Sequence, residues 1–256
     1  MEERKLKEIE YYESRAKLVQ GEKNKNTKGD FEGFDPLALS SFKFLYSLLK
    51  KRILGKIILD YGCGNGIHST FLIKSGAERV IGIDLSEKSL EIAKEKAKKD
   101  GVENKIEFIK MDCEKLDFPD GYFDIILDGG TFSSLDLEKA LPELRRVLKP
   151  GGVLLGIETF GHNHFTNLKR SFNKLTGKRT SWAAEHIFKE DKMKMVKNYF
   201  NETNYYYFHL TSWLAFPFIG STLGNIFLNF LESIDKVLLK VSFLKKYCFK
   251  VVFIFK

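Results

Sequence analysis

A regular alternation of short apolar runs with amphipathic segments is the strongest constraint on the fold. The apolar runs occur at residues 56–61, 79–85, 105–111, 123–127 and 153–158. Segments with helical spacing of apolar residues separate several of them, and Ser86 stands where it can cap one of these helices. Such alternation produces right-handed crossovers and a mostly parallel sheet with helices on both faces. The sequence therefore predicts an α/β protein.

The sequence after residue 158 is less regular. Helices are expected near residues 163–175, 189–200 and 220–241, and strands near 205–210 and 247–254. Pro142 stands where it would fit the first turn of a helix. We expect one folded unit in three parts: an N-terminal helical lid (1–52), a ligand-binding core (53–160), and acceptor-side helices with the final two strands (161–256).

Residues 59–66, LDYGCGNG, form the most specific motif of the chain. The motif follows an expected strand and precedes a helix, whose first N–H groups can bind an anion. Its glycines follow G-x-G-x-G, whereas a dinucleotide loop has G-x-G-x-x-G. Asp60, two residues before the first glycine, can face an ammonium group. The motif therefore favours an amino-acid ligand over a pyrophosphate, and disfavours an NAD-dependent oxidoreductase.

Two further carboxylates end the next strands. Asp84 closes the second strand, where a carboxylate can accept hydrogen bonds from ribose hydroxyls. Asp112 closes the third strand, where a carboxylate can accept from an adenine amino group. Sheets of this kind bind ligands at the carboxyl ends of their strands, so these groups are expected to share one site.

From about residue 57 to residue 158, these motifs resemble the class I S-adenosylmethionine-dependent methyltransferases of small-molecule type, like methyltransferase domains 11 and 25. The resemblance implies a Rossmann-like seven-stranded, mostly parallel sheet with an antiparallel last strand and helices on both faces. It implies that the enzyme uses S-adenosyl-L-methionine. It also implies a cofactor site made of Asp60, Gly62, Cys63, Gly64, Gly66, Asp84, Leu85, Asp112, Cys113, Asp128 and Gly129.

By the same resemblance, the glycine motif holds the methionine end, and Asp128 with Gly129 lies near the sulfonium. The Tyr11-Tyr12-Glu13 segment is similar to the start of small-molecule members, in which a helix folds over the cofactor. Tyr12 is therefore a candidate cofactor contact. The alternative is that this aromatic pair only packs within an amphipathic helix.

Two histidines are candidate bases for a hydroxyl acceptor. His162 follows the fifth strand directly, and His186 lies in a segment similar to one in natural-product methyltransferases. Each could instead cap a helix or brace a loop. His68 is interpreted as a packing or capping residue. No pair of histidines has the spacing of a metal site on one helix, so no metal is expected.

Charge and composition limit the partners. The net charge is +8, but the lysines are interspersed with acids and form no compact basic patch, so nucleic-acid binding is not expected. The fourth strand is followed by DGGTF, without the motif that orients a flipped base or planar amine. A small-molecule acceptor with a hydroxyl or amine, lipophilic or aromatic, is favoured. No leader is recognised and the three cysteines are isolated, which suits the cytoplasm.

Residues 213–246 combine an apolar stripe with a cluster of lysines. The stripe comprises Ile226, Phe227, Phe230, Ile234, Val237, Leu238 and Val241. This segment could contact a membrane peripherally, cover the acceptor pocket, or form a buried amphipathic helix that packs on the core of the protein. Two other functions stay open: a membrane-surface methyltransferase acting on a lipid, quinone or lipid-linked glycan, and a non-catalytic cofactor-binding module. The acceptor and the oligomeric state are not predicted.

Overall fold

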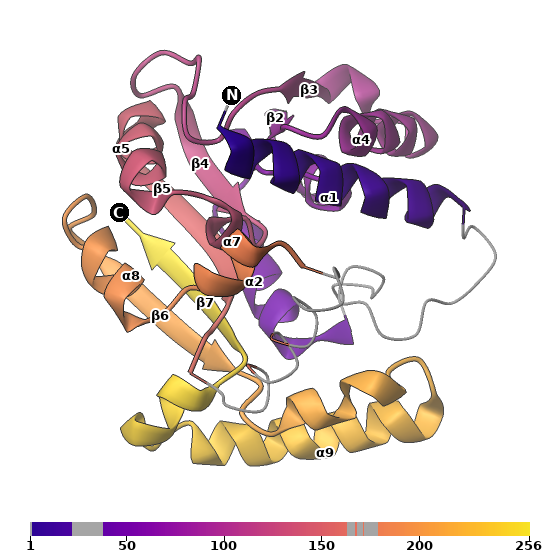
Figure 1. Cartoon of the computed structure of the whole chain (residues 1–256), viewed down its shortest axis with the longest axis vertical. Helices are drawn as coiled ribbons and strands as arrows, with labels where there is room; N and C mark the ends of the chain where they lie inside the picture. The colour runs from indigo at the N-terminus through magenta and orange to yellow at the C-terminus, as the bar shows by residue number, and fades with distance from the viewer. Residues whose placement is uncertain (1, 22–37, 163–166, 168–170, 172–178) are drawn as a thin grey trace.

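The computed structural model describes residues 2–21, 38–162, 167, 171 and 179–256 (Figure 1). Its strands form one seven-stranded sheet in the order β3-β2-β1-β4-β5-β7-β6. The strands β1 to β5 are parallel, and β7 is antiparallel to both of its neighbours. The predicted α/β class and antiparallel last strand are confirmed. The bounds are β1 Ile57–Tyr61, β2 Arg79–Asp84, β3 Ile106–Lys110, β4 Phe123–Asp128, β5 Leu148–Thr159, β6 Thr203–Phe208 and β7 Lys250–Phe255.

Helices cover both faces of the sheet (Figure 1). One face packs against α2 (Ser40–Lys50), α3 (Ile67–Lys74) and α4 (Glu87–Lys99), and the shared core includes Leu49, Leu72 and Ala97. The opposite face packs against α5 (Leu137–Val147) and α8 (Glu190–Val196). Burying both faces explains why the central strands are continuously apolar rather than alternating.

The capping residues confirm the predicted start of one helix and contradict the predicted start of another. Ser86 caps α4 as predicted, because its Oγ accepts a hydrogen bond from the Ser89 N–H at 3.1 Å. Pro142 does not lie in a first turn: α5 begins at Leu137, and the Asp136 side chain caps it. The helix tolerates this interior proline because its apolar side is fully buried, which offsets the loss of one backbone hydrogen bond.

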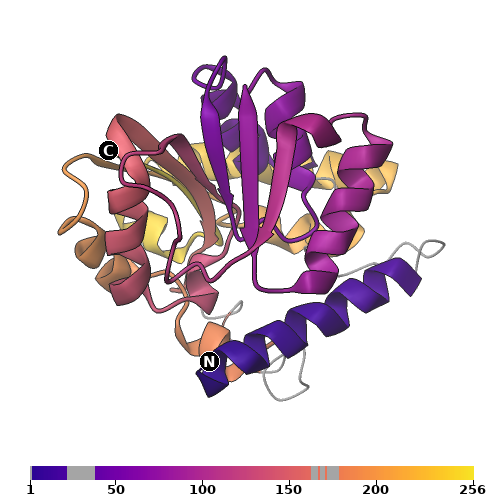
Figure 2. The same ribbon diagram turned by 90° about the horizontal axis from the view of Figure 1, so that it is seen from above.

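The strand order reverses between β1 and β4, and in sheets of this type the reversal marks the ligand-binding crevice. The first helix, α1 (Glu3–Gly21), runs across the molecule outside the two helical layers (Figure 2). It lies beside the short connections η3 (Phe132–Ser134) and α7 (Ser181–Glu185), where the chain leaves β4 and β5. The N-terminal segment therefore covers the edge of the sheet where ligands bind.

The C-terminal segment forms η4 (Ser212–Phe218), α9 (Thr222–Leu238) and η5 (Ser242–Tyr247) before β7. The predicted helix at 163–175 lies almost entirely outside the described residues. Leu228 and Leu231 pack α9 onto η4 in a third apolar cluster. The predicted stripe is mostly on another side of the helix: Ile226, Phe230 and Val237 are 60%, 61% and 64% exposed, so a helix that buries this stripe is the wrong interpretation. Within the described residues, no helix is long and apolar enough to cross a membrane.

Candidate functional site

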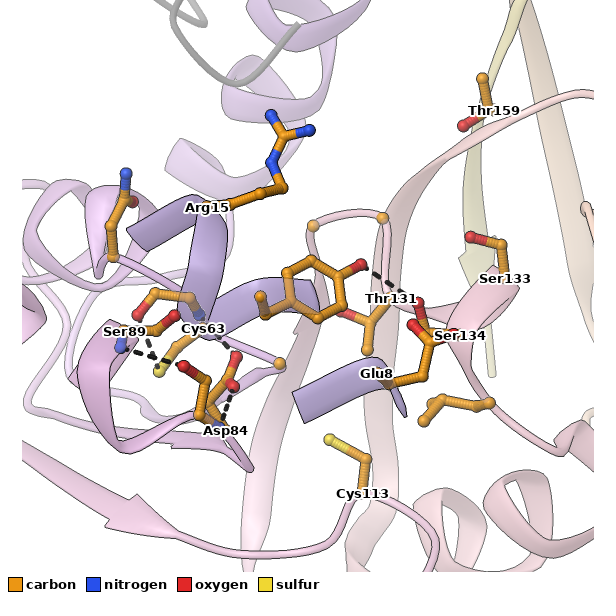
Figure 3. A pocket seen from close by; sticks show the side chains of 18 of the residues that line it. Glu8, Arg15, Cys63, Asp84, Ser89, Cys113, Thr131, Ser133, Ser134 and Thr159 are labelled. Carbon is orange, nitrogen blue, oxygen red and sulfur yellow. Dashed lines mark hydrogen bonds between the residues drawn. The ribbon is translucent and has the colours of Figure 1, made fainter. Parts of the chain in front are cut away.

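A cavity of about 710 Å³ opens at the carboxyl ends of the parallel strands. Elements far apart in the sequence line it, including α1, the glycine motif after β1, the ends of β2, β3 and β4, and η4. Figure 3 shows Cys63 and Asp84 on one side of this cavity, and Ser133, Ser134 and Thr159 on the other. Pockets that bind small molecules commonly occupy about 300–1,000 Å³, so this one is of the right size.

The glycine motif forms a tight loop between β1 and α3. Gly62 has a φ of +68°, and a Cβ atom there would stand 2.2 Å from the Thr131 Oγ1, so only glycine fits. Gly64 has a φ of +49°, but a Cβ atom there would meet nothing within 4 Å. The backbone at Gly64 therefore borders open space in the cavity, as a loop that contacts a ligand through its backbone must.

Asp84, at the end of β2, fixes this loop. Its Oδ2 accepts a hydrogen bond from the Gly64 N–H at 3.0 Å, and its Oδ1 accepts one from the Ser86 N–H at 2.8 Å. Burial raises the pKa of Asp84 above its ordinary value, while these backbone N–H groups oppose that effect. Each oxygen can accept a further hydrogen bond, so the carboxylate can serve the loop and a ligand hydroxyl together.

The end of β3 supplies Asp112, Cys113 and Glu114, which all line the cavity. The Asp112 Oδ2 lies 2.6 Å from the Lys5 Nζ, and Glu114 receives the Arg4 guanidinium at 2.7 Å. Both cations belong to α1. The carboxylate predicted for an adenine contact is therefore also an anchor for the helix that covers the cavity.

Helix α1 has the covering position that the lid prediction requires. The Tyr12 hydroxyl lies 3.1 Å from the Ser134 Oγ, and Tyr12 lines the cavity. Glu8 of the same helix accepts a hydrogen bond from the Thr180 hydroxyl. The Arg4 guanidinium also stacks over the Trp182 ring at 4.4 Å. These contacts tie α1 to η3 and α7 across the cavity.

Two of the predicted acids are buried behind the cavity wall. Asp60 accepts a hydrogen bond from the Ser69 hydroxyl through Oδ2, and burial raises its pKa to about 7. Asp128 accepts from the Thr131 N–H at 2.9 Å, and burial, together with the nearby Glu158, holds its pKa well above its ordinary range. Among the described residues, one oxygen of each acid has no hydrogen-bond partner.

The predicted cofactor contacts are therefore largely brought together. Nine of these residues line the cavity: Tyr12, Gly62, Cys63, Gly64, Asp84, Leu85, Asp112, Cys113 and Gly129. Asp60 and Asp128 lie behind the wall, and Gly66 caps the start of α3. Their individual roles toward a ligand stay predictions.

His162 and His186 do not join this group, because neither lines the cavity as described. The His162 ring packs edge-on against Phe160 with centroids 5.5 Å apart. The His186 ring stacks on Trp182 at 3.6 Å, and its Nδ1 lies 3.0 Å from the Trp182 carbonyl oxygen. Their assignment as bases stays a prediction, and their contacts fit the bracing role equally well.

His68 and Lys250 line the cavity instead, and sequence reasoning gave neither a role toward the acceptor. The His68 Nδ1 lies 2.8 Å from the Tyr46 hydroxyl, and the ring stacks on Phe42. Burial, with a smaller effect from Lys250, lowers the pKa of His68 to about 4. Its imidazole is therefore neutral near pH 7. Lys250 opens the last strand, and nothing in its sequence context points to a cavity.

The far end of the cavity is apolar. Its wall comes from the start of α2, from η4 and from the residue before β7, and comprises Leu39, Phe42, Trp213, Leu214, Phe216, Pro217 and Phe249. The polar loop end and this apolar end form one continuous space, so the cavity can hold a polar ligand and an apolar one next to each other. Within the described residues, no cluster of ligating side chains is arranged to hold a metal ion.

The central part of the chain is similar in sequence to known methyltransferases. A family model described as a methyltransferase domain matches residues 59–156. A demethylmenaquinone methyltransferase of Bacteroides fragilis is 44% identical over 103 residues, which cover 40% of this chain and 42% of the relative. An uncharacterised protein of Haemophilus influenzae is 30% identical over 155 residues, which cover 57% of this chain and 62% of that protein. The chain thus spans about two fifths of the length of the first of these relatives.

Solved structures share the whole fold at low identity. The cyclase SpnF superposes with a TM-score of 0.62 at 17% identity, over 99% of this chain and 96% of that chain. A phosphoethanolamine N-methyltransferase of Haemonchus contortus, solved with S-adenosylhomocysteine, gives 0.58 at 18% identity, over 83% of this chain and 51% of that chain. These likenesses concern the fold alone, and one of them is to a cyclase.

Proposed function

We propose that this chain is a class I S-adenosylmethionine-dependent methyltransferase that transfers a methyl group from S-adenosylmethionine to a lipophilic small molecule, and the matching methyltransferase-domain model supports the proposal. The observation that carries the proposal is the single cavity with a polar loop at one end and an apolar wall at the other. The proposed acceptor is an aromatic or long-chain molecule that presents a hydroxyl, an amine or an electron-rich ring carbon.

The residues of the polar end suit this cofactor. The open space at Gly64 leaves room for the methionine end, and the unpartnered Asp60 oxygen lies behind the same loop. Asp84 can accept from the ribose, and Asp112 from the adenine amino group. When bound, S-adenosylmethionine supplies an activated methyl group on a positively charged sulfur.

The protein's own task is then to align the acceptor and exclude water. Helix α1 closes the polar end, held by the pairs of Arg4 and Lys5 with Glu114 and Asp112. At the apolar end, Phe42 and Phe216 offer aromatic surface to a ring or chain. The neutral His68 imidazole can accept a hydrogen bond from an acceptor hydroxyl, and the Lys250 ammonium can stabilise an oxygen that loses its proton.

The proposed class of acceptor rests on the similarity to relatives as well as on the lining of the cavity. The matched stretches of a demethylmenaquinone methyltransferase and of a sterol 24-C-methyltransferase of Aspergillus fumigatus cover about 40% of this chain. By their names, both relatives act on lipophilic molecules. Their likeness extends the proposed acceptors to ring or chain carbons, beyond the hydroxyl or amine expected from the sequence.

The test is the acceptor-dependent formation of S-adenosylhomocysteine. Purified protein is incubated with S-adenosylmethionine and two matched panels, one of quinols, phenols and prenols and one of polar hydroxyls and amines. We expect turnover with members of the apolar panel only, and its loss in Asp84→Ala. Equal turnover of both panels contradicts the proposed acceptor class. Binding of S-adenosylhomocysteine without any turnover would favour a non-catalytic module.

A further inference from the structure

The solvent side of α9 carries a continuous apolar face that no described part of the chain covers. We define the α9 face by its exposed large side chains, which are Leu223, Ile226, Phe227, Phe230 and Val237. At 3.6 residues per turn these positions span an arc of about 100° on one side of the helix. A different arc, with Leu228 and Leu231, packs onto the core. Such an exposed patch marks an interaction surface, since monomeric proteins rarely leave one uncovered.

The charges around the α9 face are mainly positive. The two acids of α9 turn inward: Asp235 accepts hydrogen bonds from the Thr211 and Ser212 N–H groups, and Glu232 accepts one from the Ser40 N–H. The lysines that follow are Lys236, Lys240, Lys245 and Lys246, and none of them forms an ion pair within the described residues. The surface beside the apolar arc is therefore cationic, which complements an anionic partner.

The same segment borders the cavity. Leu214 and Pro217 of η4 line the apolar end of the cavity, and both are also exposed to solvent. Phe218, the next residue, is 56% exposed. Figure 1 shows α9 along the outer edge of the molecule. Exposed apolar side chains thus occur on both α9 and η4, and η4 also forms part of the wall of the acceptor end.

We propose that the α9 face docks on the surface of a bilayer that contains anionic lipids, and that lipophilic acceptors enter the cavity from the bilayer past Leu214 and Pro217. The apolar side chains insert among the acyl chains while the lysines contact the headgroups, as in helices that lie in a membrane interface. This inference deepens the proposed function by naming the source of the acceptor, but the docking step itself requires no methyl transfer.

The first measurement is flotation with vesicles of phosphatidylcholine, with and without phosphatidylglycerol. We expect binding to the anionic vesicles, weakened by high salt. Ile226→Ser with Phe230→Ser should weaken it at least tenfold, because both side chains are exposed and their loss leaves the core intact. The matched control is Leu54→Ser, which removes an 82% exposed leucine just before β1, at the amino ends of the parallel strands.

The second measurement separates charge from apolar area. Lys236→Glu with Lys240→Glu should weaken anionic binding by about 25-fold or more, since each lysine near such a surface contributes roughly fivefold. Lys94→Glu with Lys98→Glu, on the exposed side of α4, changes the net charge equally and should have little effect. Lys245 and Lys246 are left unchanged because Glu190 lies beside them.

The outcomes are distinct. Wild-type protein that fails to float, or variants of the α9 face that float like the Leu54→Ser control, overturn the proposal. A dimer in light scattering that dissociates in Ile226→Ser with Phe230→Ser also overturns it, because a second copy then covers this face. A thermal shift with S-adenosylhomocysteine in every variant keeps the cofactor claim separate: its absence in wild-type protein refutes the proposed function while leaving the docking result standing.

Discussion

Removing the Arg4 guanidinium should release α1 from the cavity without unfolding the sheet. Arg4 is 11% exposed and donates two hydrogen bonds, of 2.7 and 2.8 Å, to the Glu114 carboxylate, which is 1% exposed. In Arg4→Ala, Glu114 keeps only the Lys5 ammonium at 2.8 Å and the Asp136 N–H at 2.7 Å. The buried carboxylate would therefore be partly unpaired.

Breaking a buried ion pair by removing one partner costs about 3–5 kcal/mol. Because Glu114 retains two partners, about 2 kcal/mol is the expected loss from the docking of α1, or about thirtyfold in its docking equilibrium. The assay is hydrogen exchange of the amides of α1 and of β1, in one sample. We expect faster exchange in α1 by about this factor and unchanged exchange in β1.

Two further variants make this prediction sharper. Lys7→Ala removes an exposed pair with Glu3 on the same helix, and should leave exchange in α1 nearly unchanged. Adding Glu114→Gln to Arg4→Ala removes the unpaired charge. The loss of α1 docking free energy in the double variant should therefore be smaller than the sum of the losses in the two single variants. Unchanged exchange in α1 of Arg4→Ala, or equal acceleration in α1 and β1, would refute the view of α1 as a separately docked lid.

Three further outcomes follow from the glycine loop and its acid. Gly62→Ala should lower the melting temperature strongly, since its Cβ atom overlaps the Thr131 side chain, whereas Gly64→Ala should mainly weaken S-adenosylhomocysteine binding, as measured by calorimetry. Asp60 has a folded-state pKa of about 7, above the unfolded value, so it lowers the free energy of unfolding as pH rises from about 4 to 7; Asp60→Asn should flatten this dependence in urea titrations. Calorimetry in buffers of different ionisation enthalpy near pH 6 should detect proton release on binding, because a ligand ammonium favours the charged Asp60 carboxylate.

Each of these three predictions has an outcome that would contradict it. Equal melting temperatures for Gly62→Ala and Gly64→Ala would contradict the different surroundings of the two glycines. An unfolding free energy with the same pH dependence in wild-type protein and Asp60→Asn would contradict the raised pKa. Proton release that persists in Asp60→Asn would assign it to another group.

Local sequence patterns predicted the sheet because they act over short distances. Buried parallel strands need continuous apolar runs, and the loop after β1 needs glycine, so both features can be recognised in the sequence. Ser86 marked the start of α4 for the same reason. The start of α5 is not predicted correctly, because proline favours a first-turn position, whereas in the structure Asp136 caps the helix and Pro142 lies inside it.

The acceptor end could not be predicted in the same way. His68 is near Gly129 and Lys250 only because three distant segments meet at the edge of the sheet. His162 and His186 follow β5 closely in sequence, but ring contacts with Phe160 and Trp182 hold them outside the cavity lining. The α9 stripe was recognised as apolar, but only the structure distinguishes the arc that packs on η4 from the arc that faces solvent.

The most direct test of the central claim follows the methyl group itself. S-Adenosylmethionine labelled in its methyl group is incubated with the protein and an apolar acceptor, and the organic-extractable product is analysed together with S-adenosylhomocysteine. The account predicts that label appears in the acceptor in equal amount to the S-adenosylhomocysteine formed, and that Asp84→Ala abolishes both. An acceptor that is converted while S-adenosylmethionine keeps its methyl group would contradict the account, and would assign this fold a different reaction here.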